Sequence, residues 1–244
     1  MSKKVVLVIV EGQTEELVFF DFLQERFDNL EIRIDVQCGD VVSNWNRKHG
    51  TVESAIEHVI KNYLNTYRLM PSDLLAVVQF TDTDGCFIND KFIRVDRIKA
   101  TRTRYGKNGI YVTTKFKKLQ MIERNQVKAE NMKTLAQDRY AAYKKRKIPY
   151  RLYYFSINLD HVLWGEQNAK GNSKLEKAES FLEHLDMPLD QFLRQFTPLD
   201  EAVPWEENWE KSWQDITKEL NSLQRSTNMP FVLDFIDSIL ETHP

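Results

Sequence analysis

Four carboxylates lie at two points of the sequence where an apolar run ends. Glu11 follows the run VVLVIV and precedes Gly12, and Glu15 comes about one helical turn later. Asp82 and Asp84 follow the run LLAVVQF within the sequence TDTDG. Mg²⁺ prefers hard oxygen ligands and is often held by a few carboxylates together with substrate phosphates. These residue types predict a site for one or two Mg²⁺ or Mn²⁺ ions that acts on a phosphodiester.

Strands must bring these side chains together. The apolar runs read as strands buried on both faces, because apolar residues do not alternate with polar ones. We predict strands over 4–10, 31–37 and 74–80 and helices over 14–27 and 51–67. This β-α-β-α-β order implies a parallel, helix-covered sheet whose site lies at the carboxyl ends of the strands. If the first and third strands are neighbours, Glu11 converges with Asp82 and Asp84.

Each acidic motif also has a structural explanation. An acidic residue at a helix start is favoured by the helix dipole, so Glu15 needs no function. The Asp-Thr-Asp-Gly sequence is compatible with a simple turn. Their occurrence together at two strand ends favours a site in which Glu11, Asp82 and Asp84 hold the principal ion. Glu15 would then either bind metal or only cap the helix.

The rest of the chain gives a less regular pattern. Residues 110–116 read as a short strand, 125–147 as a basic helix ended by Pro149, and 151–156 as a further core strand. From residue 173 onward we predict helices over 173–185, 189–196, 208–223 and 231–240. Trp205, Trp209 and Trp213 share one helix face and are interpreted as packing residues.

The sequence VLVIVEGQTEELVF, followed by LLAVVQFTDTDGC, resembles the Toprim domain of topoisomerases, primases and OLD-family nucleases. The form EGxTExxxF is most similar to the OLD-like branch. The resemblance implies a Toprim-like (Rossmann-like) α/β fold: a parallel sheet flanked by helices, with a basic insertion and an α-helical C-terminal region. It covers roughly residues 4–85 and, more weakly, 151–165. It implies that Glu11, Asp82 and Asp84 bind Mg²⁺ and that Glu15 carries a second ion.

The chain departs from this pattern at one strand end. OLD-like nucleases carry Ser-x-Glu there, whereas this chain reads Ser156-Ile157-Asn158 with Asp160 just beyond. Either Asp160 replaces the glutamate, with Ser156 beside it, or the second metal is weakened or absent. The lysine of that branch corresponds to Lys170 or Lys174. No Walker A motif is present, so an ATPase would be a separate partner protein.

A basic block lies inside an acidic protein. Residues 91–151 contain 19 Lys or Arg and four acids, a balance of +15, although the whole chain has a net charge of −2. Such a block is expected of a nucleic-acid partner, DNA or RNA, and is also compatible with a solvated helix face. Tyr105, Tyr111, Tyr140 and Tyr143 would stack on bases or pack. The candidate nucleic-acid contacts are Arg94, Arg97, Arg102, Arg104, Lys115, Lys117, Lys118, Lys144, Lys145 and Arg146.

Two other functions compete with a metal-dependent nuclease acting in phage or foreign-DNA defence. One is a catalytically weak Toprim-like module that binds nucleic acid or protein. The other is a haloacid-dehalogenase-type phosphatase, in which Asp82 would be the nucleophile and Asp84 the acid/base. The phosphatase leaves Glu11 without a role. His161 would orient a phosphate or, more simply, serve as a structural residue.

Composition limits the class of protein. The 244 residues suit a Toprim-like domain over 1–165, with its basic insertion at 86–150, and a helical region over 166–244 packed on it. Cys38 and Cys86 lie far apart without a CxxC partner, which fits a reducing cytoplasm. The apolar run near the N-terminus is shorter than the core of a signal peptide, and no stretch is long enough to cross a membrane.

Overall fold

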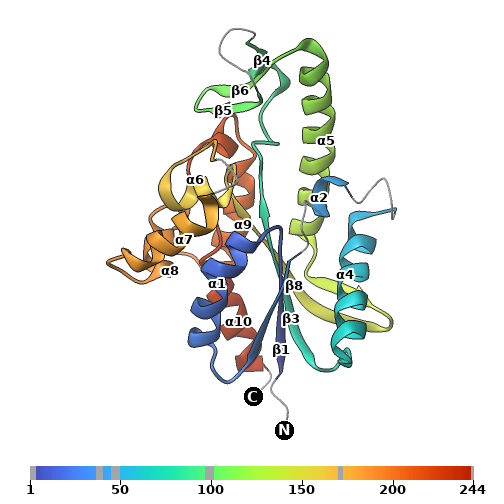
Figure 1. The fold of residues 1–244 in the computed structure, drawn as a ribbon. Coiled ribbons are helices and arrows are strands. Elements are labelled where there is room, and N and C mark those ends of the chain that lie inside the picture. Colours follow the sequence, from blue (N-terminus) through green and yellow to red (C-terminus); the bar gives the residue numbers. More distant parts are fainter. Residues whose placement is uncertain (1–3, 37–40, 45–49, 97–101, 170–172, 243–244) are drawn as a thin grey trace.

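The computed structural model describes residues 4–36, 41–44, 50–96, 102–169 and 173–242. At its centre is a five-stranded sheet of order β2-β1-β3-β8-β7, in which only β7 and β8 are antiparallel. This confirms a Rossmann-like α/β fold with a largely parallel sheet (Figure 1). The strands are β1 Val5–Val10, β2 Glu31–Val36, β3 Leu74–Asp82, β7 Tyr140–Tyr143 and β8 Arg146–Phe155.

Helices cover both faces of the sheet (Figure 1). On one face lie α1 (Gln13–Arg26) and α10 (Phe231–Thr242), where Phe19 of α1 stacks on Phe155 of β8. On the other lie α4 (Val52–Tyr67) and the end of α5 (Lys115–Gln137), with the short α2 (Val41–Asn44) between them. Every residue of β1 is buried, because both faces of the strand are covered.

The β-α-β-α-β order predicted for the first part of the chain is confirmed. Thr51 caps α4 by accepting a hydrogen bond from the Ser54 amide, as its position before the helix predicts. The third strand runs two residues beyond its predicted end, so Asp82 is the last residue of β3. β1 and β3 are neighbours, which meets the condition for Glu11 and Asp82 to converge.

The helix predicted over 125–147 is wrong at both ends. α5 begins at Lys115, where Thr114 accepts a hydrogen bond from the Lys117 amide, and ends at Gln137. The chain then forms the hairpin of β7 and β8, in which exposed and buried residues alternate over Tyr140–Tyr143. Pro149 lies within β8 opposite Tyr140 of β7, so it does not end a helix.

The later part of the predicted insertion forms α5, β7 and the start of β8, so it belongs to the main body of the protein. The first part forms a small second layer beyond the carboxyl edge of the main sheet (Figure 1). It contains a three-stranded sheet of order β4-β6-β5, preceded by the 3-10 turn η1. Ile93, Ile110 and Val112 form a separate apolar cluster with Ile157 and Leu223 of the main body. The bounds are η1 Asp90–Phe92, β4 Ile93–Val95, β5 Arg104–Gly106 and β6 Gly109–Val112.

The remaining helices pack on the sheet. Leu193, Trp209 and Ile236 belong to the same hydrophobic core as β1, and Phe155 forms a β-bridge with Thr227. Trp209 and Trp213 are buried, as predicted for packing residues. The bounds are α6 Leu159–Trp164, α7 Lys174–Glu183, α8 Leu189–Arg194, α9 Trp205–Ile216 and η3 Asn221–Leu223. Within the described ranges, no helix combines the length and apolar character needed to cross a membrane.

Candidate metal and phosphate site

Glu11 and Asp82 meet at the carboxyl edge of the sheet. Glu11 directly follows β1, and its Oε1 accepts a hydrogen bond from the Thr81 hydroxyl at 2.5 Å. The Asp82 amide lies 3.3 Å from the same oxygen. The parallel pairing of β1 with β3 produces this contact, because it brings both strand ends to one edge.

Asp82 links this pair to the β8–α6 junction. Its Oδ1 accepts a hydrogen bond from the Leu159 amide at 3.1 Å. Burial raises the pKa of the Asp82 carboxyl well above its ordinary value. The negative charges of Glu11, Glu15 and Asp84 raise this pKa further, and Lys128 opposes them. Asp82 is therefore a crowded carboxylate that a nearby cation would stabilise.

Glu15 is buried at the start of α1 and approaches Gly12. A Cβ atom at residue 12 would lie 3.0 Å from Glu15 Oε2, so glycine leaves room for this carboxylate. Burial raises the pKa of Glu15, the nearby backbone and Lys174 lower it, and Asp160 raises it. Glu15 is thus buried near Asp160 and Lys174 rather than exposed to solvent. A carboxylate that only stabilised the helix dipole would not need to be buried.

Asp160 brings a fifth carboxylate to this edge from α6. Its side chain is only 2% exposed, and Oδ2 forms an ion pair with Lys174 Nζ at 2.5 Å. Among the described residues, Asp160 Oδ1 is a buried oxygen with no hydrogen-bond partner. Such an orphaned oxygen is costly unless something else approaches it. We call Glu11, Glu15, Asp82, Asp84 and Asp160 the acidic cluster.

Asp84 has different neighbours from Asp82. Thr83 lies between them and is fully buried, and its hydroxyl accepts a hydrogen bond from the Ile157 amide at 2.8 Å. Asp84 adopts a positive φ of 49° and points to α5, where Lys128 Nζ lies 2.8 Å from its Oδ2. Arg124 contributes a longer ion pair to Oδ2 and donates to the backbone carbonyl of Asp84.

Lys128 and Arg124 were not predicted as partners of the cluster. Lys128 is completely buried although it lies in a basic helix. Asn125, Lys128, Met132 and Leu135 recur at helical spacing on the buried face of α5. Extending the apolar positions Met132 and Leu135 backward by one helical turn would have identified Lys128 as buried.

Ser156 and His161 have structural partners. Ser156 is buried, and its hydroxyl donates to the Asn221 carbonyl at 3.5 Å, toward η3. The Ser156 carbonyl contacts His161 Nδ1 at 3.1 Å. Burial lowers the pKa of His161, which favours the neutral ring. These contacts fit the structural interpretation of His161. The other candidate lysine, Lys170, lies outside the described residues, whereas Lys174 contacts Asp160.

The predicted basic surface is divided between two edges of the sheet. Arg94, Arg104, Lys115 and Lys117 are exposed on the insertion and on the start of α5, beyond the carboxyl edge (Figure 1). Lys118 is half-buried there, and exposed Arg102 donates to the Asn168 carbonyl. Lys144 and Lys145 form the β7–β8 turn, and Arg146 is the first residue of β8, at the amino edge of the sheet. Arg97 lies outside the described residues.

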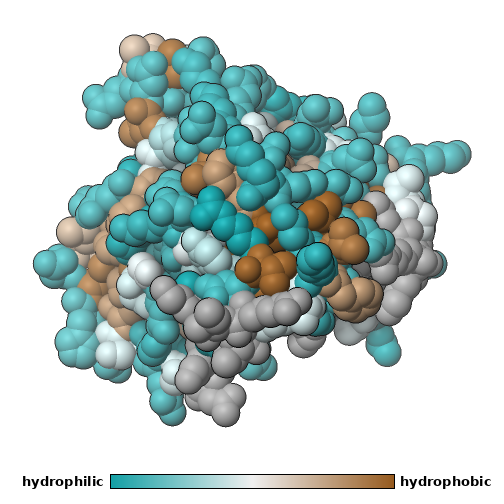
Figure 2. Space-filling model, turned by 90° about the horizontal axis from the view of Figure 1, so that it is seen from above, coloured by the Kyte–Doolittle hydropathy of each residue, from teal (hydrophilic) through white to brown (hydrophobic). Residues whose placement is uncertain are grey.

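The tyrosines are divided in the same way. Tyr105 directs its hydroxyl toward Asp84 Oδ1 at 3.5 Å, and Arg104 lies over the Tyr111 ring at 5.1 Å. Tyr143 is buried, whereas Tyr140 is exposed on the hairpin. The insertion exposes a different aromatic ring, Phe116, which is 67% accessible between Lys115 and Lys117. Figure 2 looks down on this end of the molecule, where hydrophilic residues surround scattered apolar ones.

The acidic cluster fits a divalent cation only in part. Its hard oxygen donors, the orphaned Asp160 Oδ1 and the raised pKa values of Glu15 and Asp82 all favour one. Yet within the described parts of the chain, no three His, Cys, Asp or Glu side chains are grouped closely enough to hold an ion. Instead, Asp84 forms an ion pair with Lys128, and Asp160 forms one with Lys174. Ion binding therefore requires side chains to move.

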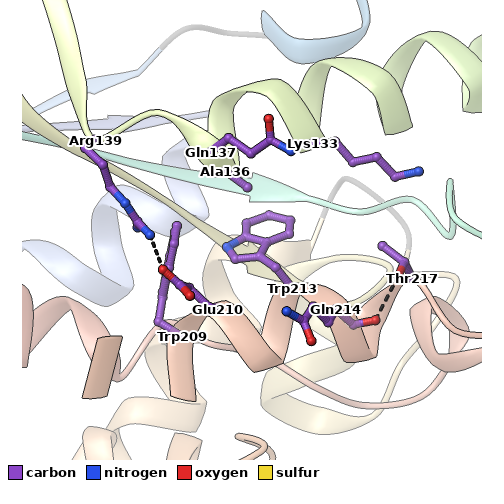
Figure 3. Close-up of a pocket in the computed structure, with 9 residues that line it drawn as sticks. All are labelled: Lys133, Ala136, Gln137, Arg139, Trp209, Glu210, Trp213, Gln214 and Thr217. Atoms are coloured by element: carbon purple, nitrogen blue, oxygen red, sulfur yellow. Dashed lines mark hydrogen bonds and ion pairs between the residues drawn. The ribbon is translucent and has the colours of Figure 1, made fainter. Parts of the chain in front are cut away.

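A separate groove lies between the end of α5 and α9 (Figure 3). It has a volume of about 390 Å³, and Arg139 forms an ion pair with Glu210 at its edge. None of the predicted site residues lines it. Its lining residues are Lys133, Ala136, Gln137, Arg139, Trp209, Glu210, Trp213, Gln214 and Thr217.

Comparisons of the chain with protein-family models, with curated proteins and with solved structures find no match. The Toprim resemblance therefore stays a prediction that rests on the two acidic motifs and on the order of the elements that carry them.

Proposed function

We propose that the protein is a metal-dependent nuclease that hydrolyses phosphodiester bonds of DNA or RNA at the acidic cluster. The contact of Glu11 with Thr81 and Asp82 supports this most directly, because it joins the two acidic motifs at one sheet edge. The five carboxylates of the cluster also outnumber the nearby cations Lys128, Arg124 and Lys174, which adds to this support. An anionic substrate alone would be repelled there, so a cation must accompany it.

Glu11, Asp82, Glu15 and Asp160 are the residues that would hold Mg²⁺ or Mn²⁺. A bound ion supplies charge for the phosphate oxygens and lowers the pKa of a coordinated water. The chain's own residues do the rest. Glu11 is a candidate for accepting or returning a proton, and Gly12 leaves room for the Glu15 carboxylate beside the start of α1.

The exposed start of α5 is the part of the basic insertion best suited to a nucleic acid. Lys115 and Lys117 are exposed there, and the apolar side chains of Phe116 and Leu119 are 67% and 65% accessible. Lysines attract phosphates, and an exposed ring offers a base a stacking surface. This combination favours a nucleic acid with unpaired bases as the substrate.

A binding module without strong catalysis is the second candidate. The Lys128–Asp84 ion pair favours it, because a carboxylate already neutralised by a buried ammonium is a poor metal ligand. The same protein would then hold nucleic acid or a partner protein through its insertion.

Cleavage assays separate the two candidates. The full chain is incubated with single-stranded DNA, double-stranded DNA and RNA in Mg²⁺ or Mn²⁺. A nuclease cuts at least one of them only with the ion. Glu11→Gln and Asp82→Asn should then each lower the cleavage rate by at least about a hundredfold. Loss of a residue that only supports a metal ligand lowers activity by up to about a hundredfold, and loss of a ligand itself should cost at least as much.

The exposed neighbour Glu16 provides the matched control. Glu16→Gln removes the same charge from α1 but outside the cluster, so it should keep the wild-type rate. Binding without cleavage by the wild type would reject the nuclease and leave the binding module.

We extend the proposal to a cytoplasmic role in phage or foreign-DNA defence, with any ATPase supplied by a separate partner protein. The resemblance to OLD-family nucleases and the absence of a Walker A motif from this sequence support this extension. Stable co-purification of such an ATPase with the tagged protein would test the partner.

A further inference from the structure

The two lysines of the acidic cluster differ in how they are held. Lys128 is 0% exposed and sits on the buried face of α5, with Nζ 2.8 Å from Asp84 Oδ2. Lys174 is 35% exposed at the start of α7, with Nζ 2.5 Å from Asp160 Oδ2. A lysine at the surface can turn its ammonium into water at small cost, whereas a buried one cannot. Lys128 is therefore fixed and Lys174 is displaceable.

Asp84 is also enclosed by other donors. Its Oδ1 lies 3.5 Å from the Tyr105 hydroxyl, and Arg124 Nη1 lies 3.6 Å from its Oδ2. Arg124 Nη2 donates to the Asp84 carbonyl at 3.1 Å, which holds the loop itself against α5. Each carboxylate oxygen of Asp84 thus already faces a donor, whereas Asp160 Oδ1 has no hydrogen-bond partner within the described residues.

We propose that Lys128 is a permanent cation of the acidic cluster, standing at Asp84 in place of a divalent ion. The cluster then takes a single divalent ion at its other four carboxylates, after Lys174 turns outward. This inference rests on the proposed function and specifies its metal content. It assigns Asp84 to positioning the loop rather than to holding the ion.

Mn²⁺ binding to the full chain tests the inference without any activity measurement. Electron paramagnetic resonance and calorimetry count bound ions and give their affinity. The wild type should bind one Mn²⁺ per chain. Lys128→Met, which keeps the length of the side chain but removes the ammonium, should bind two, because Asp84 becomes available.

Lys174→Met is the matched variant. It removes the same charge from the displaceable position, so it should keep one Mn²⁺ but bind it more tightly, by at least about threefold, since no ammonium competes with the ion. Asp84→Asn should keep one ion and lower its affinity less than Asp82→Asn does, because it removes a charge near the ion but no ligand. Asp82→Asn should weaken the ion by at least about tenfold.

The outcomes distinguish the inference from the proposed function. Two ions in the wild type, or a loss of affinity in Asp84→Asn as large as that in Asp82→Asn, would overturn the inference and leave the metal-dependent site intact. One ion in both the wild type and a folded Lys128→Met would also overturn it. If the wild type binds no Mn²⁺, the proposed function itself fails. If Lys128→Met does not fold, the contrast between Asp84→Asn and Asp82→Asn decides.

Discussion

Two aspartates separated by one threonine have opposite surroundings. Asp82 faces Glu11 and the start of α6, whereas Asp84 faces α5 and two of its cations. Thr83, anchored to the Ile157 amide, separates them. The sequence predicted both aspartates as equal ligands, because a strand end and a glycine turn were the only guides to their direction. Their different roles depend on Lys128, which is 44 residues from Asp84 in the chain.

The crowding of Asp82 makes a prediction about stability and pH. Its pKa in the folded protein is raised above the ordinary 3.8, so the fold binds this proton more tightly than the unfolded chain does. The stability conferred by this proton is complete below 3.8 and is lost as the pH rises through the folded-state pKa. Asp82→Asn keeps the oxygen that faces Leu159 but cannot ionise. It should therefore melt at a higher temperature than the wild type at neutral pH, without metal.

Melting curves over a series of pH values check this prediction. The advantage of Asp82→Asn should shrink as the pH falls toward the ordinary Asp value and should be smaller when Mn²⁺ is present. Glu16→Gln, at an exposed position, serves as the control and should show no such trend. If Asp82→Asn is less stable than the wild type at neutral pH, the conclusion that the charge of Asp82 destabilises the metal-free fold is wrong.

At the scale of elements, the strands of the sheet were easier to predict than α5, the helix that carries Lys128 and Arg124. β1 and β3 are continuous apolar runs, so both strands followed from the sequence, with the end of β1 at Val10 correct and that of β3 two residues too early. α5 carries few apolar residues, and its lysines lie on both exposed and buried faces. Its start and its end were therefore wrong in the predicted helix 125–147, and the hairpin after it was not predicted. The basic residues of this segment consequently lie at two edges of the sheet rather than on one helix.

The division of that surface predicts which lysines contact nucleic acid. Lys115→Gln with Lys117→Gln removes two exposed charges from the start of α5. This double variant should weaken binding of single-stranded DNA and flatten its salt dependence, because each phosphate contact contributes about 0.7 to the slope for single strands. Fluorescence anisotropy at several salt concentrations measures both effects.

Lys144→Gln with Lys145→Gln removes the same charge from the β7–β8 turn, at the other edge of the sheet. This matched pair should bind like the wild type. Equal losses in the two double variants would mean that general charge, rather than the start of α5, governs binding.

For the whole molecule, the C-terminal helices complete the core. Phe231, Phe235 and Ile236 of α10 are buried on the face of the sheet that also carries Phe155. The sequence predicted this region as helical and packed on the rest. It could not show that the same core continues through it, because a core is formed by contacts between distant segments.

This continuity predicts that residues 1–165 do not fold alone. Their removal from the C-terminal helices would expose Tyr153, whose hydroxyl donates to the Phe231 carbonyl, on one face of the sheet, and Tyr154, whose ring packs on Trp213, on the other. The fragment should lack a cooperative melting transition and should be cut by trypsin much faster than the full chain. A cooperative transition in the fragment would instead mark residue 165 as a true domain boundary.

α5 reaches from the exposed end of the insertion to the loop of Asp84 as one continuous element. Lys117 and Lys128 are 11 residues apart on it, which corresponds to about 16 Å along the axis of a helix. Because both lysines lie on one continuous helix, a force applied at the outer lysines is transmitted along α5 to the Lys128–Asp84 ion pair. Mechanical load on the outside of the protein would therefore reach the acidic edge without the movement of any separate domain.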